Sequence, residues 1–258
     1  MIHEVSPPDT PAIRELLARA NDTAYDLVKV AREKCFGAGF EGQPAARVFG
    51  DFEGISVTCG KYVRILAVDR SRRGRGVGTA LLRDAESRGA SVIAAEPGNY
   101  FTPGVSESVA QFFRKRGYAE TARTHNLVVD SLADAPPLPE EPRAAVLHFI
   151  EKNFGPIWRF EAERGATIFS AQDRGEIAGF STHEANNRGL GSFGPMGVAE
   201  SHRGRGLGRL LLLASLADLR RLGYHRAVIP WTEAIEFYRK SCGARIADQF
   251  VILRRKNA

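Results

Sequence analysis

Two glycine-rich segments have residue types that could bind phosphate. Residues 73–78 read Arg-Gly-Arg-Gly-Val-Gly, and residues 203–208, found 130 positions later, read Arg-Gly-Arg-Gly-Leu-Gly. Glycine lets the backbone approach a ligand closely, and a helix beginning in such a turn presents unpaired N–H groups and a partial positive charge. The arginines add further positive charge. Both segments are therefore predicted to hold a pyrophosphate.

The same segments lack the features of two other phosphate-binding motifs. Neither ends in Gly-Lys-Ser/Thr, the residues that reach a γ-phosphate and magnesium. A dinucleotide-binding turn would need an acidic residue about 20 positions further on, where the second copy is followed by Arg220 and Arg221. A nucleotide triphosphate site and a dinucleotide site are both disfavoured.

The repeat extends well beyond the glycine-rich segments. Each follows an apolar strand pattern and precedes apolar residues at helical spacing. Further on, Gln-Phe-Phe-Arg-Lys at 111–115 matches Glu-Phe-Tyr-Arg-Lys at 236–240. A whole domain is therefore predicted twice, as residues 1–133 and 143–258. Residues 134–142 carry four prolines and are predicted to be the linker.

The predicted fold class is α/β with a mixed sheet in each half. Strands are expected at 2–5, 46–49, 55–59, 62–68, 91–95, 167–172, 176–182, 193–198, 226–230 and 248–254, with further strand up to 129. Helices are expected at 10–20, through 34, and at 77–88, 106–116, 143–153, 207–222 and 232–241.

Composition narrows the class of protein. The chain has 258 residues, 43% of them hydrophobic and 26% charged, which is typical of soluble globular proteins. We see no apolar run of spanning length and no signal peptide at the start, and we predict a cytoplasmic protein. Three widely spaced cysteines predict neither disulfides nor a metal site. The net charge of +6 suits a protein that binds anionic phosphates.

With these motifs the sequence resembles the GNAT acyltransferase superfamily, whose signature is Arg/Gln-x-x-Gly-x-Gly/Ala. The resemblance covers most of both halves and implies two tandem GNAT-like domains that bind acetyl-CoA. In this family the turn holds the pyrophosphate, and the preceding strand holds the pantetheine and polarises the acetyl carbonyl. The residues it implies for the cofactor are Met196, Gly197, Val198, Arg203, Gly204, Arg205, Gly206, Leu207 and Gly208 in the second half, and Leu66, Ala67, Val68, Arg73, Gly74, Arg75, Gly76, Val77 and Gly78 in the first.

The resemblance also implies a proton donor for the departing thiolate, which the family commonly supplies as a helix tyrosine. Tyr238 occupies that position in the second half, whereas the first half has Phe113. Phenylalanine preserves packing but has no hydroxyl. The second half is therefore predicted to be catalytic and the first to be impaired. The alternative reading of Tyr238 is an ordinary core aromatic.

Candidates for the base that accepts the amine proton are less specific. Glu233 lies at the start of the last expected helix, next to Trp231, and His183 and Glu184 end a strand. Glu161 and Glu163 could attract a cationic acceptor. Each of these residues could equally be an exposed or helix-terminal charge.

The predicted activity is acetyl transfer from acetyl-CoA to a primary amine of a small molecule, such as an amino sugar, without a metal. A protein lysine or N-terminus is the alternative acceptor. A non-catalytic acetyl-CoA-binding protein is a further alternative. RNA binding is disfavoured, because each basic segment lies between an apolar strand and an apolar helix without stacking aromatics.

Overall fold

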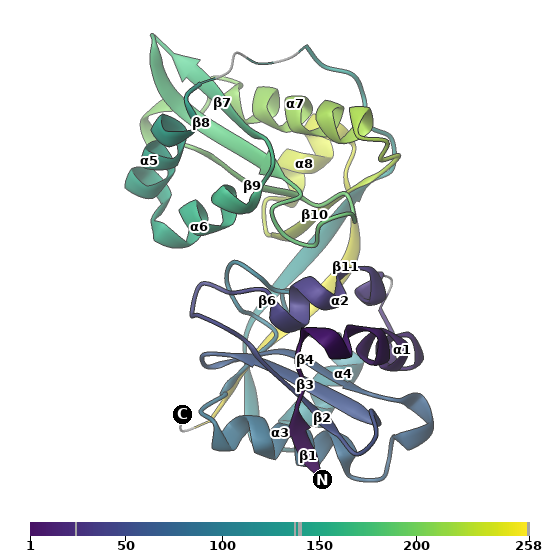
Figure 1. The fold of residues 1–258 in the computed structure, drawn as a ribbon. Coiled ribbons are helices and arrows are strands. Elements are labelled where there is room, and N and C mark those ends of the chain that lie inside the picture. The colour runs from purple at the N-terminus through teal and green to yellow at the C-terminus, as the bar shows by residue number, and fades with distance from the viewer. Residues whose placement is uncertain (24, 137, 139–140, 257–258) are drawn as a thin grey trace. The chain divides into compact units, whose positions relative to one another are not determined.

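The computed structural model describes residues 1–23, 25–136, 138 and 141–256. The chain forms two compact units. Unit 1 comprises Met1–Thr124 and Gln249–Ala258, and unit 2 comprises His125–Asp248. The predicted linker, 134–142, falls inside unit 2, and its residues 137, 139 and 140 lie outside the described part. Each unit combines helices with strands, which confirms the predicted mixed α/β class (Figure 1).

Unit 1 is a sheet covered by helices on both faces. Its strands follow the order β1-β2-β3-β4-β5-β11-β6, and β4 and β5 are parallel. All six residues of β3 are buried, so both faces of the sheet are covered. The elements are β1 (Ile2–Glu4), α1 (Thr10–Ala20), α2 (Leu27–Phe36), β2 (Ala45–Phe49), β3 (Gly54–Cys59), β4 (Tyr62–Val68), α3 (Val77–Ser87), β5 (Val92–Ile93) and α4 (Glu107–Arg114), together with parts of β6 (Tyr118–Val129) and β11 (Arg245–Arg255).

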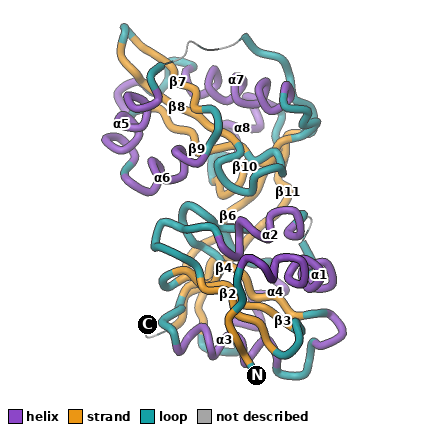
Figure 2. The backbone as a smooth tube through the Cα atoms, viewed as in Figure 1, coloured by secondary structure: helices purple, strands orange, loops and turns teal. Residues whose placement is uncertain are grey.

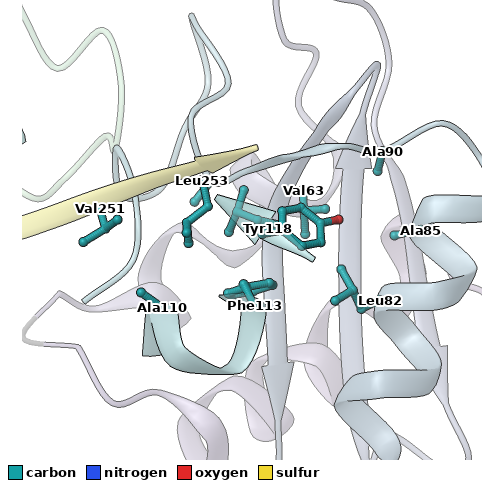
Figure 3. Packing of buried hydrophobic residues seen from close by; sticks show 11 residues of the cluster. Val63, Leu82, Ala85, Ala90, Ala110, Phe113, Tyr118, Val251 and Leu253 are labelled. Atoms are coloured by element: carbon teal, nitrogen blue, oxygen red, sulfur yellow. The ribbon is translucent and has the colours of Figure 1, made fainter. Parts of the chain in front are cut away.

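One core of unit 1 joins residues from opposite ends of the chain. Phe113 of α4 and Tyr118 of β6 pack with Val63 of β4, and Val251 and Leu253 of β11 complete the cluster (Figure 3). Leu253 pairs with Ile93 of β5. The last strand of the chain is thus an internal strand of unit 1.

Unit 2 repeats the plan with a smaller sheet. Strands β7, β8 and β9 lie side by side (Figure 2) and form an antiparallel sheet. Strand β10 pairs with the second part of β6. The elements are α5 (Arg143–Phe154), α6 (Pro156–Arg164), β7 (Ile168–Asp173), β8 (Glu176–His183), β9 (Phe193–Val198), α7 (Leu207–Arg221), β10 (Ala227–Thr232) and α8 (Ile235–Cys242).

The predicted elements are present, with three differences. Helix α6 was not expected, because only Ala162 in it is fully buried and its apolar stripe is weak. Strand β5 has two residues rather than five, since Ala94 turns the chain with a φ of 62°. The segment up to Val129 is one continuous strand of twelve residues, β6.

Candidate active site

The two glycine-rich turns have nearly the same backbone. In unit 1, Gly74 and Gly76 have φ angles of 76° and 86°, and in unit 2, Gly204 and Gly206 have 78° and 79°. Side chains are strained at such angles. A Cβ placed on any of the four would meet no atom within 4 Å. Both turns therefore present open backbone at a helix start, which fits a bound phosphate.

The first arginine of each turn holds the turn to the end of the preceding strand. Arg73 Nε donates to the carbonyl oxygen of Val68 at 3.2 Å, and Arg203 Nε donates to that of Val198 at 3.3 Å. The duplicated geometry therefore includes the arginine side chain as well as the glycines.

A carboxylate lies beside each turn, but it comes from a different element in each unit. Asp173, at the end of β7, accepts from His202 Nδ1 at 2.8 Å and from Arg205. The bond from His202, followed by the charge of Arg205, lowers the pKa of Asp173. In unit 1, Asp22 pairs with Arg73 Nη1 at 2.6 Å. Neither carboxylate was identified from the sequence, because the interaction depends on how the loops fold.

The last glycine of each turn provides space for the aromatic residue of a later helix. A Cβ on Gly78 would lie 3.5 Å from the ring of Phe112, and one on Gly208 would lie 3.5 Å from the ring of Phe237. These rings belong to α4 and α8. The turn thus sets the position of the helix that carries Phe113 or Tyr238.

Strands β9 and β10 of unit 2 part soon after they meet. Among the described residues, one parallel bridge joins Ser192, the residue before β9, to Val228 of β10. Beyond it, Phe193–Val198 pairs only with β8 on the other side. We call this divergence the strand fork of unit 2. Backbone groups of Met196, Gly197 and Val198 that point away from β8 have no strand partner there. The carbonyl oxygen of Val198 accepts from Arg203, and the other such groups can bind an extended ligand.

A β-bulge lies at the start of the fork. Ser181 pairs with Met196 and His183 with Phe193, so β9 carries one extra residue between them. The extra position falls at Gly194 and Pro195, and a Cβ on Gly194 would meet no atom within 4 Å. Sequence reasoning missed this feature, although a glycine followed by proline inside a strand is a signal for a bulge.

Tyr238 lies on α8 in the core of unit 2, close to the first residue of β9. Its ring is edge-on to Phe193, with centroids 6.2 Å apart. Burial, with a smaller effect of Cys242, raises the pKa of Tyr238 well above its usual value. The side chain is 8% exposed. A tyrosine in this setting stays protonated at neutral pH, as a proton donor must.

The candidate bases lie in different environments. Glu233 is exposed in the connection from β10 to α8. Glu184 accepts from the backbone N–H of Ser192 at 2.9 Å, from the Tyr224 hydroxyl at 2.8 Å and from the N–H of Gly189. Glu184 thus holds its loop together, and it helps burial raise the pKa of Tyr224 to about 12.

The remaining charged candidates also have defined positions. His183 is fully buried and its Nε2 lies 2.8 Å from Asp218 Oδ2. This pair was not predicted. Glu161 and Glu163 lie on α6, where Glu163 pairs with Arg159 at 3.3 Å.

Comparison with known proteins identifies this architecture. Residues 128–244 match the model of the acetyltransferase (GNAT) family. Unit 2 carries a GNAT acetyltransferase domain. The match includes the turn at 203–208, the strand fork and Tyr238. A search of curated proteins finds no match.

Solved GNAT structures resemble the chain over nearly its full length. A glucosamine N-acetyltransferase region of a fungal multi-domain β-N-acetylglucosaminidase matches 98% of this chain, with a TM-score of 0.78 and 17% identity. This chain spans only 38% of that protein. A GNAT protein from Sphaerobacter thermophilus has a TM-score of 0.68 and 19% identity, covering 100% of this chain and 96% of its own.

A tandem GNAT protein from the clavulanic acid biosynthesis pathway has a TM-score of 0.68 and 18% identity, covering 98% of this chain and 97% of its own. At these identities the likeness concerns the fold. It shows that the tandem GNAT layout predicted from the repeat is one that solved structures contain.

No helix in the described part of the chain is long and apolar enough to cross a membrane.

Proposed function

We propose that this protein transfers the acetyl group of acetyl-CoA to a primary amine of a small molecule, and that the reaction takes place in unit 2. The observation that carries the proposal is the position of Tyr238. A buried tyrosine lies against the first residue of β9, at the strand fork that follows from the GNAT fold. Unit 1 has Phe113 in the corresponding place.

The glycine-rich turn of unit 2 is the proposed site for the pyrophosphate of acetyl-CoA. Its open backbone at Gly204 and Gly206 supports this assignment, with Arg203 and Arg205 supplying positive charge. The free edge of Met196, Gly197 and Val198 would hold the pantetheine and polarise the acetyl carbonyl. Leu207 and Gly208 begin the helix behind it.

The turn of unit 1 has the same open backbone, and we assign it the same capacity for a pyrophosphate. The residues concerned are Arg73, Gly74, Arg75, Gly76, Val77 and Gly78, which follow Leu66, Ala67 and Val68 at the end of β4.

Tyr238 and Glu233 would divide the proton transfers. Glu233 takes a proton from the incoming ammonium group, which frees the nitrogen lone pair to attack the thioester carbon. As the carbon–sulfur bond breaks, Tyr238 donates its proton to the departing thiolate, and the amide nitrogen releases its extra proton to restore the tyrosine. We assign the base to Glu233 because Glu184 is already engaged by three donors.

The acceptor is tested by offering acetyl-CoA and a panel of primary amines, with amino sugars first because the fungal neighbour is a glucosamine N-acetyltransferase region. Release of the coenzyme A thiol and the mass of the product are measured. We expect a small amine to be acetylated. Acetylation confined to lysine peptides or protein N-termini would assign a protein acceptor instead, and no acetylation of any amine would contradict the proposal.

A further inference from the structure

Unit 1 has its own strand fork, built in the same way as that of unit 2. Strands β4 and β5 pair in parallel at Tyr62 with Val92 and at Val63 with Ile93, and then part. A bulge lies at the start of this fork too. Val57 pairs with Ile65 and Thr58 with Val63, so Arg64 is the extra residue. It stands 130 positions before Gly194, the offset that also relates the two turns.

The two forks differ in what lies at the bulge. Arg64 forms a two-bonded ion pair with Glu96, which follows β5, and both side chains are fully buried. Arg64 Nη2 lies 2.9 Å from Glu96 Oε1. The pair therefore links the two diverging strands. In unit 2 the bulge has Gly194, beside which a Cβ would meet only open space.

The position of Glu96 also has a counterpart. Glu96 is four residues after Val92, and Thr232 is four residues after Val228. Each valine is the residue that pairs at its own fork. A short neutral side chain thus stands in unit 2 where unit 1 has a carboxylate.

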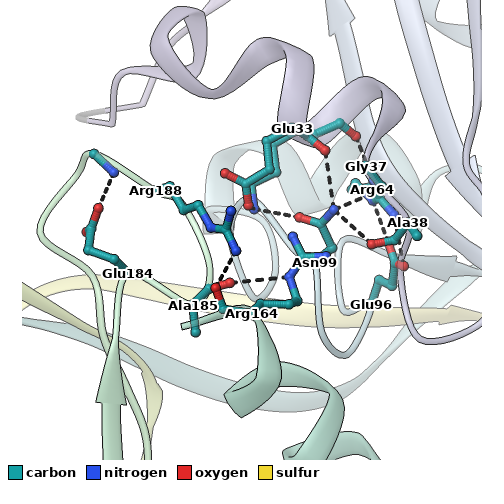
Figure 4. A network of polar contacts seen from close by, with 12 residues as sticks. Glu33, Gly37, Ala38, Arg64, Glu96, Asn99, Arg164, Glu184, Ala185 and Arg188 are labelled. Atoms are coloured by element: carbon teal, nitrogen blue, oxygen red, sulfur yellow. Dashed lines mark hydrogen bonds and ion pairs between the residues drawn. The ribbon is translucent and has the colours of Figure 1, made fainter. Parts of the chain in front are cut away.

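Further hydrogen bonds hold Arg64 in place. Its Nη1 donates to the carbonyl oxygens of Lys34 at 2.7 Å and Gly37 at 2.8 Å, at the end of α2. Asn99 Nδ2 donates to the carbonyl oxygens of Gly37 and Ala38 of the same segment (Figure 4). Asn99 Oδ1 accepts from the buried Lys34 Nζ at 2.8 Å. A buried charge pair with its partners satisfied in this way does not open readily.

In unit 2 the corresponding helix end, that of α6, is bound by an arginine from α5. Arg143, at the start of α5, donates to the carbonyl oxygen of Glu163 at 2.8 Å, in the last turn of α6, and to that of Gly165 at 2.9 Å, just after it. Arg64 at the bulge therefore caps α2 in unit 1, whereas Arg143 of α5 caps α6 in unit 2.

We propose that the Arg64–Glu96 pair occupies the space in unit 1 that unit 2 leaves open for the thioester arm of acetyl-CoA. Unit 1 then holds at most the nucleotide half of the molecule, and the chain has one acetyl-transfer site. The inference rests on the proposed function. It gives a second reason, independent of Phe113, why unit 1 would not transfer an acetyl group.

Calorimetry on the full chain distinguishes binding of the whole acetyl-CoA from binding of its nucleotide half alone. The ligands are acetyl-CoA and adenosine 3′-phosphate 5′-diphosphate, which lacks the arm. The proteins are the wild type and the matched variants Gly206→Val and Gly76→Val, in which a β-branched residue is strained at a positive φ. Circular dichroism checks that each variant is folded.

The wild type and Gly76→Val should bind acetyl-CoA at least about tenfold more tightly than the nucleotide. Gly206→Val should lose this preference. If Gly206→Val retains it, unit 1 holds the arm and the inference is wrong. If the wild type binds no acetyl-CoA, the proposed function itself fails.

The ion pair is tested directly in the Gly206→Val background. Arg64→Gly with Glu96→Thr gives unit 1 the residues of unit 2 and should restore a preference of about tenfold for acetyl-CoA. Arg64→Met with Glu96→Leu removes the charges but keeps the volume, and should restore none. If neither folded variant gains the preference, the pair does not exclude the arm. If both gain it, the arm is not excluded by the volume of the two side chains, and the inference that they occupy its space is wrong.

Discussion

At the scale of single residues, the two units show how one substitution changes chemistry without changing packing. Phe113 and Tyr238 each lie beside a second aromatic ring, with centroids 5.0 Å apart in both units. Val63 and Phe193 occupy matching strand positions beside them. The hydroxyl is therefore the feature that separates the two environments chemically, and this difference was visible in the sequence.

Other site residues depend on contacts that a sequence does not reveal. The hydrogen bonds of Glu184 bring together Gly189, Ser192 and Tyr224, which lie 5 to 40 positions away. Its place at the end of a strand suggested a base, whereas the folded loop gives it three donors. The Arg64–Glu96 pair was equally hidden, because neither residue belongs to a recognisable motif.

Asp69 offers a test of a unit 1 contact beside the turn. A bond from Arg19 at 2.6 Å, followed by bonds from Ser71, lowers the pKa of Asp69 from 3.8 to about 2. Unit 2 has Ala199 at this position. We expect Asp69→Ala to lower the thermal midpoint at pH 7 by a few degrees, as loss of a small stabilising contact does.

The pH dependence of that effect follows from the direction of the shift. A carboxylate with a lowered pKa stabilises the folded state fully above pH 3.8, and this stabilisation is lost as the pH falls through about 2. The difference between wild type and Asp69→Ala should therefore disappear near pH 2. Asp51→Ala, which removes an exposed carboxylate, is the control. A difference that persists unchanged to pH 2 would show that the ion pair is not its source.

At the scale of elements, most helices and strands were predictable because their apolar spacing is regular. The bounds of α1, β4 and β9 agree with the expected ranges to the residue. Helix α6 was missed because its burial depends on neighbours, with Trp158 stacked on Phe154 at 5.1 Å. The division at Thr124 and His125 falls within β6, which is continuous there and carries no glycine or proline to mark a boundary.

Strand β11 provides a prediction at this scale. Leu253 is fully buried in the core of unit 1, although it lies five residues from the C-terminus. We expect Leu253→Ala to destabilise unit 1 by about 2–5 kcal/mol, the range for a buried leucine. Hydrogen exchange should quicken in α4 and leave α7 unchanged. Arg254→Ala, on the exposed side of the same strand, is the control.

Faster exchange in α7 with α4 unaffected would contradict the assignment of residues 249–258 to unit 1.

At the scale of the molecule, the two units share the glycine-rich turn and differ in the residues around it. Both turns keep the same φ angles and the same arginine contact to the strand end. The forks and the aromatic position differ, and both differences point to unit 2 as the place of reaction. The repeat was evident from the sequence, whereas the Arg64–Glu96 pair at the fork of unit 1 required the structure.

The turnover of Tyr238→Phe, measured with acetyl-CoA and an accepted amine, is the most direct test that unit 2 carries out the chemistry. We predict that kcat falls by about 10²–10⁴, the usual effect of losing an acid or base, with the Kd of acetyl-CoA unchanged. Phe113→Tyr, the reciprocal change in unit 1, should leave kcat as it is. An unchanged kcat in Tyr238→Phe, or a loss of turnover in Phe113→Tyr at intact stability, would contradict the assignment of the chemistry to unit 2.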